Sequence, residues 1–92
     1  MLLPAQVDVV VIGAGLSGLA AARQIQQSGL SVVIVESSDA VGGRVRTDNV
    51  DGFLLDRGFQ VLLTAYPELA TQVDMEALDL QAFDPGAFVW IQ

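Results

Sequence analysis

The chain has 92 residues, enough for one domain at most, and 52% of them are hydrophobic; four Arg, no Lys and eleven Asp and Glu give a net charge of −7. Nucleic-acid binding through a basic patch is excluded, because such binding needs Lys and Arg to neutralise phosphates. Without Cys or His there is no disulfide, no thiolate nucleophile and no Cys/His zinc site, whereas carboxylate metal sites and Asp/Glu catalysis stay open.

The first third of the chain predicts a strand, a helix and a second strand. Residues 7–12 are mostly β-branched, which is typical of a parallel strand covered on both faces. Residues 16 to about 28 place their apolar side chains on one helical stripe, and Gly29 is a natural helix stop. Residues 31–35 form a second buried strand. This order predicts a βαβ unit.

A membrane span is not expected. The longest apolar stretch, residues 9–22, is interrupted by glycines and is shorter than the roughly 20 apolar residues that a spanning helix needs. The first basic residue, Arg23, follows this stretch, so there is no basic leader of the secretory type. The expected location is therefore cytoplasmic.

The rest of the chain predicts shorter elements. In order they are a small-residue loop at 37–43, strands at 44–47 and 53–56 around a turn at 48–52, an apolar segment at 58–63, a helix from 64–68 to about 73, a helical turn at 74–78, and one or two strands within 82–91.

The loop between the first strand and the helix contains Gly13, Gly15 and Gly18. In this spacing the first glycine permits a tight turn, the second lets the backbone approach a diphosphate, and the third allows close helix–strand packing. The positive end of the helix dipole would face the phosphates. The alternative is an ordinary strand–helix turn, but the position between a strand and a helix is the context that a dinucleotide-binding loop requires.

Glu36 ends the second strand, 18 residues after Gly18. An acidic residue at about this spacing accepts hydrogen bonds from the ribose hydroxyls of a dinucleotide and repels a 2′-phosphate, which disfavours NADP. The alternative is an exposed glutamate at a strand end. The glycine loop and Glu36 together do not separate NAD from FAD.

A third segment, Gly42-Gly43-Arg44 followed by Thr47, resembles the Gly-Gly-Arg motif of the flavin-containing amine oxidase and phytoene desaturase-like superfamily of FAD-dependent oxidoreductases. Residues 51–58 are similar to its Gly-Phe-x-x-Asp-x-Gly segment, and residues 64–68 fit a helix of the desaturase-like branch, which is slightly favoured. Many members carry Arg where this chain has Ala40. The resemblance covers roughly residues 5–80, with three motifs in register.

The resemblance implies an α/β fold: a Rossmann-like FAD/NAD(P)-binding βαβ unit followed by a β-hairpin and a short helix. Residues 1–92 would be the N-terminal part of an FAD-binding domain, the cofactor would be FAD, and the reaction would be hydride removal from a C–N or C–C bond. The residues expected to bind FAD are Gly13, Ala14, Gly15, Leu16, Ser17, Gly18, Glu36, Gly43, Arg44, Gly58, Phe59 and Gln60.

The resemblance implies that Arg44, the arginine of the Gly-Gly-Arg motif, binds the phosphates, for which its guanidinium offers a planar fork of donors. The alternative is a surface arginine that neutralises Asp39 or Asp48. Arg46 and Arg57 are interpreted as solvated residues of the strands or hairpin.

No residue indicates a catalytic base, a nucleophile or a metal ligand. Asp56 is interpreted as a structural carboxylate that accepts from loop N–H groups. The aromatic residues are interpreted as core residues; they are Phe53, Phe59, Tyr66, Phe83, Phe88 and Trp90. In a flavoenzyme the redox chemistry belongs to the cofactor.

The domain is expected to be incomplete. Enzymes of this superfamily are several times longer, and two strands that are apolar along their length need cover that one helix and a hairpin cannot supply. The expectation is the N-terminal portion of a flavoprotein, either a truncated product or half of a split enzyme, inactive alone, with FAD and the remaining part of the flavoprotein as partners. Two other hypotheses stay open: a non-catalytic interaction or remnant domain, and a fragment of an NAD-dependent dehydrogenase.

Overall fold

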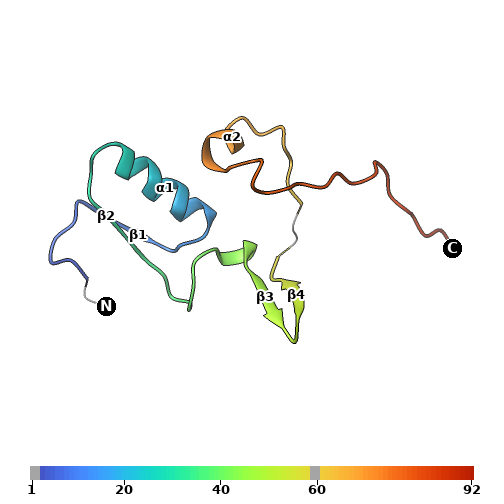
Figure 1. Ribbon diagram of the computed structural model, residues 1–92, viewed down its shortest axis with the longest axis horizontal. Helices are drawn as coiled ribbons and strands as arrows, with labels where there is room; N and C mark the ends of the chain where they lie inside the picture. The colour runs from blue at the N-terminus through green and yellow to red at the C-terminus, as the bar shows by residue number, and fades with distance from the viewer. Residues whose placement is uncertain (1–2, 59–60) are drawn as a thin grey trace. The chain divides into compact units, whose positions relative to one another are not determined.

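The computed structural model describes residues 3–58 and 61–92. The chain divides into two compact units, Met1–Leu62 and Leu63–Gln92, which are considered separately. The elements labelled in Figure 1 are β1 (Val9–Ile12), α1 (Leu16–Gln27), β2 (Val32–Val35), the 3₁₀ turn η1 (Gly43–Val45), β3 (Thr47–Val50), β4 (Phe53–Asp56) and α2 (Leu69–Gln72). Helix and strand are both present, as the sequence predicts.

β1, α1 and β2 form the predicted strand–helix–strand unit (Figure 1). The two strands are parallel and paired in register, from Val9 opposite Val32 to Ile12 opposite Val35. Their β-branched side chains are restricted at χ1 and pack well on a pleated sheet, which favours strand over helix here.

Both strands begin later than predicted because Asp8 and Ser31 bond to each other at the start of the pair. One Asp8 carboxylate oxygen, Oδ2, accepts from the Ser31 N–H at 2.8 Å and from the Ser31 hydroxyl at 2.7 Å. The Ser31 hydroxyl oxygen accepts from the Asp8 N–H at 2.9 Å. The Ser31 N–H in particular holds the pKa of Asp8 below its ordinary value. These bonds fix the register of the two strands at their N-terminal ends, and the glycine loop lies at the other end of β1.

Helix α1 begins after Gly15, whose backbone is extended, and ends at Gln27. The chain then turns at Gly29, whose φ of +83° is the left-handed conformation that commonly ends helices. Ala14 and Ala22 are the buried apolar residues of the described chain, at 1% and 6% exposure. The core that positions the loop is therefore small, and it lies between α1 and the strand ends.

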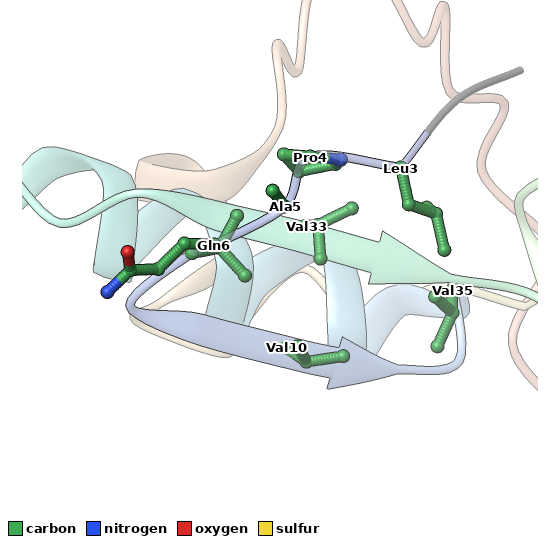
Figure 2. Close-up of a pocket in the computed structure, with 8 residues that line it drawn as sticks. Leu3, Pro4, Ala5, Gln6, Val10, Val33 and Val35 are labelled. Atoms are coloured by element: carbon green, nitrogen blue, oxygen red, sulfur yellow. The ribbon is translucent and has the colours of Figure 1, made fainter.

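An apolar pocket lies beside the sheet, between the chain before β1 and the valines of the two strands (Figure 2). Its lining residues are Leu3, Pro4, Ala5, Gln6, Val7, Val10, Val33 and Val35. Ile12 remains 87% exposed and Val10 54% exposed. The sheet thus presents an apolar surface that the described residues cover only in part.

β3 and β4 form the predicted hairpin, with Thr47 opposite Asp56 and Val50 opposite Phe53. Asp51 and Gly52 turn with φ of +52° and +84°. Two residues of positive φ suit the twist of a tight hairpin, which explains the Asp-Gly pair. The expectation of a strand at 44–47 is wrong: residues 43–45 form η1, and the strand begins at Thr47. The turn expected at 48–52 is confined to Asp51 and Gly52, because residues 48–50 pair with β4.

The second unit has little regular structure. α2 is shorter than the helix predicted from 64–68 to 73, and it follows turns at 64–65 and 67–68. The turn predicted at 74–78 is present, where the Leu78 N–H donates to the Asp74 carbonyl at 3.3 Å. The predicted strands within 82–91 are absent from the described residues, because the chain there has no partner strand to supply hydrogen bonds.

The expectation of buried aromatic residues is wrong for the five that the structure describes. Phe53, Tyr66, Phe83, Phe88 and Trp90 are all at least 62% exposed. The apolar content of this chain is therefore largely on its surface. Within the described residues, no helix combines the length and hydropathy needed to cross a membrane.

The packing of α1 on the glycine loop predicts a strong effect of substitution at Gly18. A Cβ atom there would overlap the Gly13 carbonyl oxygen, a backbone atom that cannot move aside alone. We expect Gly18→Ala to lower the free energy of unfolding by about 1–3 kcal/mol, as for other overpacked sites, although alanine favours helix. Thermal unfolding followed by circular dichroism measures the change.

Gly15→Ala is the matched control, because no atom lies within 4 Å of a Cβ at that position. It should unfold within a few degrees of the unsubstituted chain. Equal unfolding midpoints for Gly18→Ala and Gly15→Ala would contradict the packing described here.

Candidate functional site

The glycine loop leaves an open space in front of the N-terminus of α1. A Cβ at Gly13 or Gly15 would have no atom within 4 Å, and Gly13 has a φ of +97° that other residues rarely adopt. The first hydrogen bond inside the helix runs from the Leu19 N–H to the Gly15 carbonyl, at 3.0 Å. The N–H groups of the preceding residues in the first turn therefore have no partner within the helix. Open space, free donors and the positive dipole end make this loop suited to an anion.

Glu36 follows β2 and turns its carboxylate toward the glycine loop. One oxygen, Oε1, accepts from the Ala14 N–H at 2.8 Å, and the other, Oε2, accepts from the Ser38 N–H at 2.8 Å. The Ala14 N–H, followed by the Ser38 N–H, lowers the pKa of Glu36 from 4.5 to about 2. Glu36 is thus ionised and fixed at both oxygens at neutral pH.

The Gly42-Gly43 turn packs against the same loop. The Gly42 N–H donates to the Ala14 carbonyl at 2.8 Å. A Cβ at Gly43 would lie 3.3 Å from the Gly15 Cα, so the two main chains approach closely. Both glycines have positive φ, +112° and +55°. The glycine loop, Glu36 and the Gly-Gly turn therefore meet at Ala14, whose N–H and carbonyl join them.

Arg44 is exposed, and within residues 3–58 and 61–92 it makes no hydrogen bond or ion pair. The alternative, that Arg44 neutralises Asp39 or Asp48, is wrong, because other arginines pair with both carboxylates. Arg46 pairs with Asp39 at 2.8 Å, and Arg57 pairs with Asp48 at 2.8 Å. The guanidinium of Arg44 is therefore available to an anionic ligand.

The interpretation of Arg46 as a solvated residue is wrong, because its side chain is only 14% exposed. Arg57 is 41% exposed and bound to Asp48 through two of its nitrogens. The carboxylate of Asp56 accepts from the Thr47 hydroxyl at 2.6 Å, instead of from the loop N–H groups that were expected.

Gly58 lies against the Gly-Gly-Arg segment. A Cβ at this position would overlap the Arg44 carbonyl oxygen, so the close approach requires glycine. Phe59 and Gln60, the next two predicted site residues, lie outside the described residues.

Ser38 was missed by the sequence reasoning, although its N–H holds one oxygen of Glu36. A serine two positions after a strand-end carboxylate is a usable signal, because short polar residues there form local turns with backbone N–H groups. Within the part of the chain that the structure describes, no group of three or more carboxylates could hold a metal ion.

Comparisons with known proteins place this chain in a family. The family model for flavin-containing amine oxidoreductases matches residues 16–91. Putrescine oxidase of Kocuria rosea is 40% identical over 85 residues, which cover 91% of this chain and 18% of that protein. Phytoene desaturase of Fusarium fujikuroi is 32% identical over 89 residues, covering 90% of this chain and 16% of that protein.

A solved structure of a putrescine oxidase variant superposes with a TM-score of 0.58 and 51% identity, over 62% of this chain and 13% of that one. The chain thus spans less than a fifth of the length of each of these relatives. The flavin of the matched family indicates FAD as the cofactor, as the sequence predicts.

The depressed pKa of Glu36 predicts a specific dependence of stability on pH. The folded pKa is below the ordinary value, so the stabilisation is complete above about pH 4.5 and is lost as the pH falls toward about 2. We expect Glu36→Gln to be less stable than the unsubstituted chain at pH 7 and to converge with it toward pH 2. The thermal unfolding midpoint between pH 7 and pH 2 measures this.

Glu76→Gln is the control, because the Glu76 carboxylate accepts no hydrogen bond from the described residues. Its midpoint should follow that of the unsubstituted chain at every pH. A constant difference between Glu36→Gln and the unsubstituted chain from pH 7 to pH 2 would refute the carboxylate contact.

Proposed function

This chain belongs to the family of flavin-containing amine oxidoreductases, and on that premise we propose that residues 1–92 are the N-terminal, Rossmann-like part of an FAD-binding domain. The observation that carries the proposal is the junction at Ala14. Its N–H donates to Glu36 and its carbonyl accepts from Gly42, so three separate motifs line one open space. A strand–helix turn with no ligand would not need all three.

The diphosphate of FAD lies, in this proposal, against the backbone from Gly13 to Gly18. The absence of side chains at Gly13 and Gly15 gives close access to the N–H groups of the first turn of α1, including those of Leu16 and Ser17. Gly18 is a further N–H donor of this first turn, and it carries no Cβ that would overlap the Gly13 carbonyl oxygen. Its part is to bring the helix close to the strand.

Glu36 binds the adenosine ribose in this proposal. Each of its oxygens accepts one backbone N–H and keeps a further lone pair, so the fixed carboxylate can accept from both hydroxyls of a ribose diol. Its negative charge would repel a 2′-phosphate, which supports FAD and disfavours NADP.

Arg44 supplies the positive charge that a diphosphate needs in a chain with a net charge of −7. Gly43 brings the main chain close to Gly15, and the Arg44 side chain is left without a competing partner in the described residues. Gly58, Phe59 and Gln60 are the residues proposed to contact the flavin end of the cofactor.

The complete enzyme removes a hydride from a C–N or C–C bond in this proposal, and the flavin is the group that accepts it when bound. Residues 1–92 bind and orient the cofactor and contribute no catalytic side chain. An amine oxidase and a desaturase are both among the relatives of this chain, so the proposal does not choose between oxidation of a C–N bond and of a C–C bond. The remaining part of a flavoprotein is the protein partner that would cover the exposed apolar surface and make turnover possible.

Cofactor binding by the chain tests this proposal. We expect FAD to bind with a dissociation constant in the micromolar range, measured by the change in flavin fluorescence, without turnover of amines or carotenoids. Gly15→Val should abolish binding, because the added side chain occupies the space in front of the helix, where a Cβ would have no protein atom within 4 Å. Ala21→Val, on the exposed surface of α1, is the matched control and should bind FAD normally.

Arg44→Gln should weaken FAD binding about tenfold, as expected for the loss of a charge-assisted hydrogen bond. Arg23→Gln removes the same charge from the middle of α1 and should leave the affinity unchanged. If the folded chain binds no FAD, or if Arg23→Gln is as damaging as Arg44→Gln, the proposed binding mode is wrong.

A further inference from the structure

The side chain of Arg46 is largely covered by other residues, and neither its sequence context nor the site described above explains this. Its side chain is 14% exposed, although arginine is rarely buried without a specific partner. One nitrogen, Nη1, donates to Asp39 Oδ1 at 2.8 Å and approaches the Ser38 hydroxyl oxygen at 3.4 Å. The guanidinium therefore holds two consecutive residues of the loop that follows Glu36.

The bond to Ser38 connects Arg46 to Glu36. The Ser38 hydroxyl donates its hydrogen to the Ala40 carbonyl at 2.8 Å, which leaves a lone pair to accept from Arg46. The N–H of the same serine donates to Glu36 Oε2 at 2.8 Å. The orientation of Ser38, and with it one of the two bonds that fix the carboxylate, thus depends on Arg46.

The aliphatic part of Arg46 fixes the other end of the loop. A Cβ at Gly42 would lie 2.9 Å from Arg46 Cγ, so the side chain packs directly on this glycine. The N–H of Gly42 donates to the Ala14 carbonyl, and Ala14 also donates to Glu36. Arg46 therefore contacts both ends of the loop that joins Glu36 to the Gly42-Gly43 turn.

We propose that Arg46 is a positioning residue for ribose recognition: it holds Ser38 and Gly42 so that the Glu36 carboxylate faces the ribose diol of the cofactor. The inference rests on the proposed function, since it assigns to Glu36 the ribose contact given there. Arg46 itself touches no part of the cofactor in this arrangement.

The test compares two ligands, ADP and 2′,3′-dideoxy-ADP, which differ only in the ribose hydroxyls. If Arg46 acts through Glu36, Arg46→Gln weakens ADP binding about fivefold, an effect of the size found for partly exposed ion pairs, and leaves the dideoxy analogue unchanged. A merely structural role would weaken the binding of both ligands by the same factor.

Glutamine keeps most of the aliphatic stem of Arg46 over Gly42. Asp39→Asn removes the same ion pair from the other side and should have the same selective effect. Circular dichroism confirms that each variant is folded.

Arg57→Gln is the matched control, because it breaks a comparable ion pair, with Asp48, on the hairpin. It should leave the ratio of the two affinities unchanged. The inference is overturned if the unsubstituted chain prefers ADP but Arg46→Gln and Asp39→Asn keep that preference, or if Arg57→Gln lowers it equally. If the unsubstituted chain binds neither ligand, the proposed function fails, and the role of Arg46 fails with it.

Discussion

The main chain of Ala14 is the constraint on which the rest of this structure depends. Its N–H donates to the Glu36 carboxylate and its carbonyl accepts from the Gly42 N–H, so both of its polar groups are used. Ala14 is also 1% exposed, and a buried backbone group without a partner is costly. The loop that follows β2 is therefore tied at two points, Glu36 and Gly42, to the loop that follows β1.

The distribution of charge around this junction is consistent with one anionic ligand. Arg46 and Arg57 are neutralised by Asp39 and Asp48, which also lowers the pKa of each of these carboxyl groups. Arg44 alone among the arginines of the hairpin segment is left without such a partner in the described residues. The N-terminus of α1 and the fixed Glu36 carboxylate meet at Ala14, and Arg44 follows Gly43, which packs on Gly15. A nucleotide needs both features, because its phosphates bind to cations and N–H donors and its ribose hydroxyls donate to a carboxylate.

Local sequence patterns predicted the strand–helix–strand unit, a hairpin with its turn within residues 48–52, and the glycine loop, because each depends on neighbours in the chain. The role of Arg46 was not predictable in this way, since it arises only when the loop after β2 folds back on the residue that follows η1, whereas the bond from Ser38 to Glu36 is local. The strands predicted within 82–91 failed for a related reason. Their apolar composition favours a strand, but a strand forms only where a second one supplies its hydrogen bonds.

The most direct test of this account is an NMR titration of the ¹⁵N-labelled chain with ADP. The account predicts that the amide signals of residues 13–18, 36–38 and 42–44 shift together with a single dissociation constant, because Ala14 joins these segments around one ligand. Shifts confined to one segment, or centred on amides elsewhere in the chain, would contradict it.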